Sequence, residues 1–114
     1  EMLIDFMPHL AVTKDKSEVK VSFVIYFQII DSLKYTYATE NSLLTMKELC
    51  VEELKSVIAG MELYEIGHSS DIVNEKLKRE LNIKAEFLGI KVNRAELKET
   101  DVLYESAKLR LHKV

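Results

Sequence analysis

The side chains most suited to chemistry are scattered along the chain. His9, His68 and His112 lie far apart in the sequence, and none stands at a metal-ligand spacing from a cysteine or a carboxylate. Cys50 is the one cysteine, and it falls on the apolar stripe of a predicted helix, where a thiol packs as a small hydrophobic side chain. Reactive thiols need exposed, electropositive surroundings. We therefore predict no metal site and no catalytic cysteine.

The carboxylates that lie closest together include Glu52, Glu53 and Glu62. General acid–base catalysis requires a pocket that tunes proton affinity, and no other polar feature of the sequence converges on these residues. The sequence also lacks the nucleophile-elbow, phosphate-loop and dinucleotide-binding motifs. We expect a protein that is not an enzyme and that binds no cofactor.

The composition is that of one globular domain. The 114 residues are 47% hydrophobic and 31% charged, which fits a folded chain rather than a disordered one. The net charge of −3 argues against nucleic-acid binding, which needs a concentrated basic surface. No apolar run approaches the roughly 20 residues of a membrane-spanning helix. Because the chain begins directly on a strand-like segment, we expect a domain excised from a longer protein.

A long strand is predicted at residues 19–30, because apolar side chains recur there at every second position. Two shorter apolar runs, Met2–Phe6 and Leu10–Val12, precede it and are separated by Pro8. The second face of the long strand begins polar and becomes apolar toward its end. We expect this face to form an interface, covered either by a helix of the same chain or by a partner. It carries Val24, Tyr26, Gln28 and Ile30.

Two long amphipathic helices are predicted in the middle of the chain. The first runs from Ser42 to a stop at Gly60; its apolar stripe begins at Leu43, and Glu53 is among the residues expected to face solvent. The second begins near Ser70 and places Ile72 on its inner face, together with Val73, Leu77 and Leu81.

A closing strand is predicted at residues 87–97. Its apolar positions change parity between Val92 and Ala95, which indicates a β-bulge near Asn93–Arg94. Strands, two helices and a final strand, in this order, predict an α+β fold: a mainly antiparallel sheet with two principal helices packed on one face.

The last residues contain a stripe at helical spacing, formed by Leu103, Ala107 and Leu111. We expect this stripe to form an interface as the root of a coiled coil. The alternative is a short helix that packs back on the domain.

Five segments, in their order and spacing, resemble the stomatin/prohibitin/flotillin homology domain, also called band 7. The resemblance covers the chain from about Met2 to Asp101, nearly its full length. The segments are "DFMPHLAVTKD" (Asp5–Asp15), "VKVSFVIYFQIID" (Val19–Asp31), "LKSVIAGMELYEI" (Leu54–Ile66), "SDIVNEKLKREL" (Ser70–Leu81) and "LGIKVNRAELKE" (Leu88–Glu99). Stomatin-like members are the best match among the branches.

The resemblance implies a homology domain at residues 1–101, followed at 102–114 by the start of a C-terminal helical extension. It also implies a non-enzymatic, membrane-associated scaffold that forms homo-oligomers and organises membrane microdomains or modulates ion channels or membrane proteases. Membrane attachment would come from regions outside this chain, with the domain at the cytoplasmic face. The alternative is a monomeric module that binds a protein or peptide and recruits a membrane client.

Overall fold

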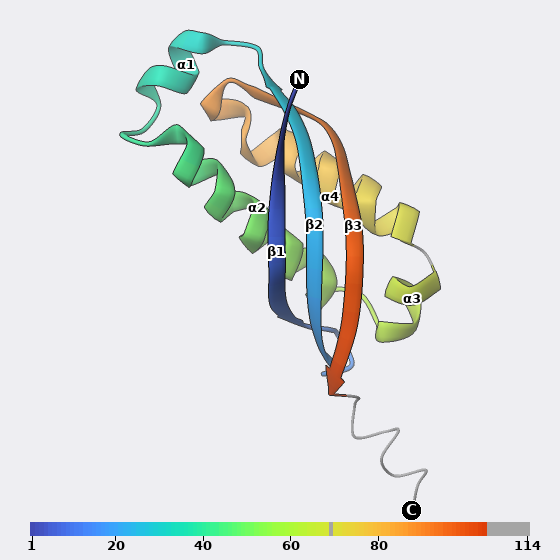
Figure 1. The fold of residues 1–114 in the computed structure, drawn as a ribbon. Coiled ribbons are helices and arrows are strands. Elements are labelled where there is room, and N and C mark those ends of the chain that lie inside the picture. The colour runs from blue at the N-terminus through green and yellow to red at the C-terminus, as the bar shows by residue number, and fades with distance from the viewer. Residues whose placement is uncertain (69, 105–114) are drawn as a thin grey trace, which may run out of the picture.

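The computed structural model describes residues 1–68 and 70–104, and it places a three-stranded antiparallel sheet in front of a layer of helices (Figure 1). The strands lie in the order β1–β2–β3. The predicted α+β fold, with two principal helices on one face of the sheet, is confirmed. The strands are β1 (Met2–Val12), β2 (Glu18–Ile29) and β3 (Ile90–Tyr104). The helices are α1 (Ser32–Tyr37), α2 (Ser42–Ala59), α3 (Leu63–His68), α4 (Ser70–Lys84) and the 3₁₀ turn η1 (Glu86–Leu88).

The two short apolar runs at the N-terminus form one strand, β1, with an irregularity in its middle. Phe6 pairs with Phe23, but the next pair joins His9 to Val21, so β1 has one residue more than β2 at this point. Pro8 lies inside this bulge. A proline cannot donate a ladder hydrogen bond, and bulges on edge strands are among the few sheet positions that accept it. The bulge therefore lets one strand continue through a residue that the sequence suggested would end it.

A bulge also lies where the parity of β3 changes, as predicted. Val92 pairs with Phe27 and Arg94 with Tyr26, which leaves Asn93 as the extra residue. The bulge turns both Val92 and Ala95 toward the helices, and both are buried. A bulge bends its strand and increases the local twist.

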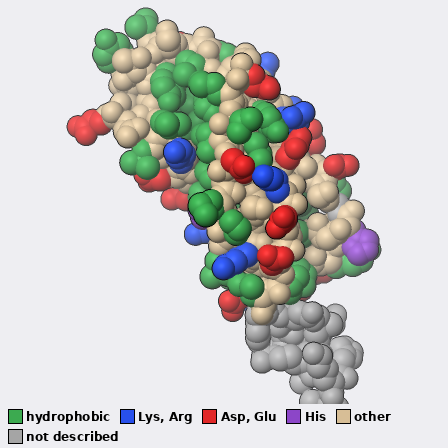
Figure 2. Space-filling view, in the orientation of Figure 1, with side chains coloured by type: hydrophobic (Ala, Val, Ile, Leu, Met, Phe, Trp, Pro, Cys, Tyr) green, Lys and Arg blue, Asp and Glu red, His purple; other side chains and the backbone are tan. Residues whose placement is uncertain are grey.

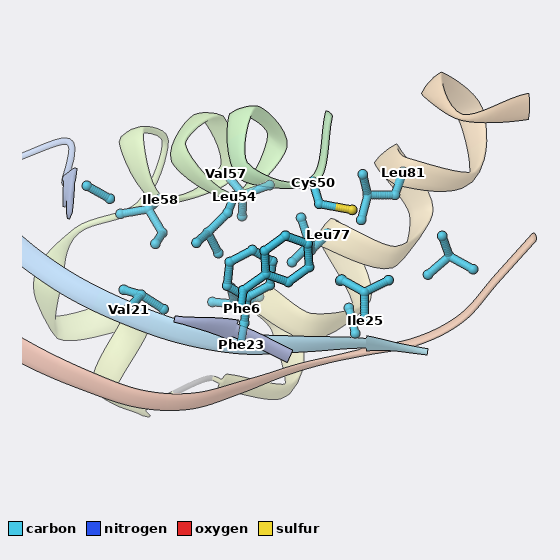
Figure 3. Packing of buried hydrophobic residues seen from close by; sticks show 14 of the residues in the cluster. Phe6, Val21, Phe23, Ile25, Cys50, Leu54, Val57, Ile58, Leu77 and Leu81 are labelled. Carbon is cyan, nitrogen blue, oxygen red and sulfur yellow. The ribbon is translucent and has the colours of Figure 1, made fainter. Parts of the chain in front are cut away.

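The core lies between the sheet and helices α2 and α4 (Figure 3). At its centre the rings of Phe6 and Phe23 stack with their centroids 4.3 Å apart. The inner faces of the two helices meet these rings, and the side chains shown there include Cys50, Leu54, Leu77 and Leu81. Two predicted core positions at the N-terminal ends of the helices, Leu43 and Ile72, are exposed instead. Each lies within the first three residues of its helix, where the stripe has not yet reached the sheet.

The turn between β1 and β2 is hydrogen-bonded to the backbone that follows α2. The hydroxyl of Thr13 donates to the carboxylate of Asp15 and accepts from the backbone N–H of Ser17 at 3.0 Å. The hydrogen bond from Thr13 lowers the pKa of Asp15. The backbone N–H of Lys14 donates to the carbonyl of Met61 at 2.8 Å. Thr13 and Asp15 thus build a turn between β1 and β2.

The far end of the sheet is closed by a tight corner that the sequence did not reveal. Asp31 caps helix α1, because its carboxylate accepts from the backbone N–H of Lys34 at 3.1 Å. The backbone N–H groups of Ile30 and Asp31 both donate to the carbonyl of Gly89, at 2.8 and 3.1 Å. The sequence analysis assigned no element to residues 32–37, which the structure shows as a short helix.

Candidate interaction surfaces

The strand face predicted as an interface is the outer face of the sheet. Helices α2 and α4 cover the opposite face, so within the described residues no helix covers this one (Figure 1). Tyr26 is half-buried and Gln28 is exposed. Val24 is buried, because it lies between Asp5 and Glu96 of the neighbouring strands. Ile30 is exposed just beyond the end of β2.

Four charged side chains on this outer face form two ion pairs. Arg94 lies over the ring of Tyr26, 4.1 Å from its centroid, and its Nε lies 2.7 Å from Glu96 Oε1. The interaction with Tyr26 raises the pKa of Arg94. Lys98 Nζ lies 3.3 Å from Asp5 Oδ1. Figure 2, which looks onto this face, shows green apolar side chains interleaved with blue and red charged ones. A partner would therefore meet a surface of mixed character, on which four of the charged side chains are paired with each other.

Of the C-terminal stripe, the structure describes only Leu103. It lies in β3 and is exposed, so the helix expected from residue 102 does not begin there; the sheet continues to Tyr104. Ala107 and Leu111 lie outside the described residues. The domain boundary at residue 101 and the coiled-coil root stay predictions.

Two asparagines of α4 occupy part of the β3 edge of the sheet, at Val92 and at Leu97. Asn82 donates from its Nδ2 to the carbonyl of Val92 at 3.0 Å and accepts from the N–H of Val92 at 2.8 Å. Asn74 accepts from the N–H of Leu97 at 3.0 Å. A side-chain amide thus takes the place that a further strand would occupy. The sequence analysis missed this role; its signal is two asparagines eight residues apart on a helix that packs beside a strand.

The β1 edge is open. Within the described ranges, no other element hydrogen-bonds to the outer edge of its backbone. Leu3 and Met7 are 58% and 79% exposed, and three further apolar side chains of β1 are exposed as well: Met2, Leu10 and Val12. Exposed apolar edge strands are templates for pairing with another chain.

A groove of about 430 Å³ runs between β1 and α2. Its lining includes Phe6 and His9 from the strand and Val51 from the helix, with charged residues on the helix side: Lys47, Glu48 and Glu52. The ring centroid of His9 lies 6.4 Å from that of Phe6, edge to face. The groove combines an apolar floor with a charged rim, an arrangement typical of protein-binding surfaces.

The candidate chemical residues do not come together. Cys50 is buried, and burial raises the pKa of its thiol to about 12. Glu53, expected on the solvent face, is 4% exposed, with one oxygen 2.5 Å from Lys84 Nζ. That hydrogen bond raises the pKa of Lys84, which is the last residue of α4. The other carboxylate oxygen of Glu53 has no hydrogen-bond partner within residues 1–68 and 70–104. The same residues contain no cluster of three or more histidine, cysteine or acidic side chains that could hold a metal ion.

Comparison with known proteins identifies the fold's family. The model of the SPFH domain / Band 7 family matches residues 2–105. The chain belongs to this family. The resemblance seen in the five sequence segments is thereby confirmed, and the match includes the whole sheet and both principal helices.

The SPFH domain described here is similar to archaeal and bacterial proteins. An uncharacterised protein of Methanocaldococcus jannaschii is 31% identical over 97 residues, which are 85% of this chain and 49% of that protein. A stomatin homolog of Pyrococcus horikoshii is 28% identical over 88% of this chain and 38% of its own. An uncharacterised protein of Mycobacterium tuberculosis is 28% identical over 89% of this chain and 26% of its own. The chain spans about half the length, or less, of these relatives.

Membership of a stomatin-like family suggests a membrane-associated scaffold. None of the helices that the structure describes is long and apolar enough to cross a membrane.

Proposed function

We propose that this SPFH domain is a non-enzymatic scaffold that self-associates at the cytoplasmic face of a membrane, where it organises microdomains or modulates membrane partners such as ion channels or proteases. The proposal rests on one observation: the described helices pack on only one face of the sheet. The helices cover one face of the sheet and leave the other face and the β1 edge available to partners. Membrane attachment in this proposal comes from regions outside the chain.

The distribution of charge supports a protein partner. The outer sheet face carries ion pairs that are already satisfied, Arg94 with Glu96 and Lys98 with Asp5. A partner that covers these two pairs would bury charges that already have a counter-charge, which lowers the cost of forming an interface. The net charge of −3 does not favour direct adhesion to anionic lipid, which attracts clusters of lysine and arginine.

The experiment that tests the proposal measures self-association in solution and on a surface. Light scattering over a wide concentration range should show a molar mass that rises above the monomer. The domain is then tethered to vesicles through an N-terminal affinity tag, and energy transfer between labelled copies reports clustering. We expect transfer that grows with surface density more steeply than for a tethered monomeric protein of the same size. A constant monomer mass together with transfer no greater than for that reference protein would contradict the proposal.

The alternative function is a monomeric module that captures a protein or peptide of a membrane client. The groove between β1 and α2 favours it, because a groove beside an open strand edge is a known place for extended peptides. The mass measurement separates the two functions: a module of this kind stays monomeric at all concentrations and gains mass only when a client peptide is added.

A further inference from the structure

We propose that the self-association surface is the β1 edge, and that it pairs in antiparallel fashion with β1 of a second copy of this chain. The two sheets would join into one continuous sheet about a two-fold axis. This inference rests on the proposed function and names the surface that performs it.

The first argument is the difference between the two edges of the sheet. At the β3 edge, Asn82 occupies both hydrogen-bonding groups of Val92, and Asn74 occupies the N–H of Leu97. At the β1 edge, no other element in the described part of the chain reaches the outer backbone. A strand arriving at Val92–Leu97 would have to displace two asparagine side chains, whereas no other described element hydrogen-bonds to the outer edge of β1.

The second argument is the character of β1 itself. Its one acidic residue is Asp5, and Lys98 of β3 lies 3.3 Å from that carboxylate. Antiparallel pairing of two copies would therefore bring apolar side chains together without opposing two unpaired carboxylates. Leu3 and Met7 are well exposed in the single copy, and cross-strand apolar pairs stabilise an antiparallel sheet. A second copy thus matches this edge in both charge and polarity.

The third argument concerns the size of the assembly. A two-fold pairing uses the same β1 edge on both copies, so this contact closes as a dimer. Pro8 cannot donate a hydrogen bond and interrupts the ladder, so continuous pairing is limited to the residues before it, Met2–Met7. This contact is smaller than the roughly 1,600 Å² of a standard interface. We therefore expect a weak dimer that forms at high protein concentration.

The test replaces apolar residues of the edge by lysine, the side chain that natural proteins use to block edge pairing. Leu3→Lys and Met7→Lys change residues that are 58% and 79% exposed. The matched controls are Ile83→Lys on α4 and Leu33→Lys on α1, at residues 63% and 70% exposed. Circular dichroism confirms that each variant is folded, and sedimentation equilibrium gives the dissociation constant of the dimer. We expect the β1 variants to weaken it at least tenfold and the controls to leave it within twofold.

A measurement on the unchanged chain accompanies the variants. Amide hydrogen exchange at Met2–Phe6 should slow when the protein is concentrated, while exchange at Val92 should not change. Three outcomes are informative. Self-association that the β1 variants do not weaken, with exchange at β1 independent of concentration, overturns this pairing but leaves the proposed scaffold intact. A chain that stays monomeric in solution and does not cluster on vesicles overturns both. Weakening by the controls as strong as that by the β1 variants also overturns the pairing.

Discussion

The corner between η1 and β3 leaves no room for a side chain at residue 89. Gly89 has φ +69°, and a Cβ atom placed on it would lie 2.3 Å from the carbonyl oxygen of Asp31. The backbone cannot easily shift to relieve this clash, because the carbonyl of Gly89 accepts hydrogen bonds from the backbone N–H groups of Ile30 and Asp31. Positive φ at a residue with a side chain costs about 1–3 kcal/mol even before a clash is counted.

We therefore predict that Gly89→Ala lowers the free energy of unfolding by about 2 kcal/mol or more, measured by urea denaturation. Gly67→Ala is the matched control. A Cβ atom at Gly67, which lies within α3, would meet nothing within 4 Å. Alanine is favoured over glycine in a helix by up to about 1 kcal/mol, so this control should be neutral or slightly stabilising. Equal effects at the two glycines would show that the corner is more adaptable than its geometry indicates.

Cys50 should behave as a hydrophobic side chain and not as a thiol. Burial raises its pKa from 9.0 to about 12, so at pH 8 only about one folded molecule in ten thousand carries a thiolate. We predict that a thiol-specific reagent modifies the native protein only as fast as the protein unfolds. Ser56→Cys, on the exposed side of the same helix, supplies a control thiol that should react at once. Rapid native modification of Cys50 would contradict this prediction.

The same shift has a consequence for stability at alkaline pH. The folded state holds the Cys50 proton more tightly than the unfolded state does. The contribution of this protonated thiol to the free energy of unfolding is therefore fully present below about pH 9. It is lost as the pH rises from 9.0 toward about 12, where the unfolded chain releases the proton first. Cys50→Ala should show a shallower decline of unfolding free energy over this range than the unchanged chain.

At the scale of elements, helix α4 both fills the core and closes the sheet. Leu77 and Leu81 are buried on one side of it, while Asn74 and Asn82 reach the backbone of β3. Asn82→Ala removes two hydrogen bonds to Val92, and we expect it to lower the unfolding free energy by about 1–3 kcal/mol. Hydrogen exchange at the Val92 amide should accelerate.

The variant Asn82→Asp distinguishes the effects of the two hydrogen bonds between Asn82 and Val92. The carboxylate still accepts from the Val92 N–H, but it can no longer donate to the Val92 carbonyl. We therefore expect the Val92 amide to remain protected in Asn82→Asp and to lose protection in Asn82→Ala. Equal protection in all three proteins would mean that the edge is shielded by packing alone.

The elements that were predicted from sequence are those with a strong period. The alternation through β2 and the apolar stripes of α2 and α4 follow from burial of one face, and the parity change in β3 located the bulge at Asn93. The elements that were missed depend on single polar contacts. Helix α1 is set by the cap at Asp31. The burial of Glu53 follows from the approach of Lys84, 31 residues away, which no local pattern records.

The outer face and the edges of the sheet were only partly predictable for a similar reason, and their role as interfaces stays a prediction. The sequence identified the outer face of β2, because its apolar positions are visible in one strand. It could not identify which sheet edge is open, since that depends on asparagines of a helix meeting the backbone of a strand far along the chain. The continuation of β3 through Leu103 was also hidden, because a single leucine fits both a helical stripe and the alternation of a strand.

For the whole molecule, the core formed by the described residues lies well before the last ten residues of the chain. Its buried hydrophobic cluster runs from Phe6 to Ala95, and β3 pairs with β2 as far as Tyr104. We therefore predict that a chain ending at Tyr104 unfolds cooperatively, with a free energy within about 0.5 kcal/mol of the 114-residue chain. A larger loss of stability would mean that residues 105–114 pack on the domain, as the alternative interpretation of the C-terminal stripe requires.

The shortened chain also separates two origins of assembly. If pairing through β1 drives self-association, removal of residues 105–114 leaves the dissociation constant unchanged, because Met2–Phe6 lies at the edge strand and is retained. If a coiled coil rooted in the Leu103, Ala107 and Leu111 stripe drives it, the shortened chain becomes monomeric while the β1 variants still associate. Sedimentation equilibrium on the shortened chain and on Met7→Lys therefore gives opposite patterns for the two mechanisms. A strand edge and a helical extension in one chain would supply two different contacts, and two different two-fold contacts allow repeated copies to build an assembly larger than a dimer.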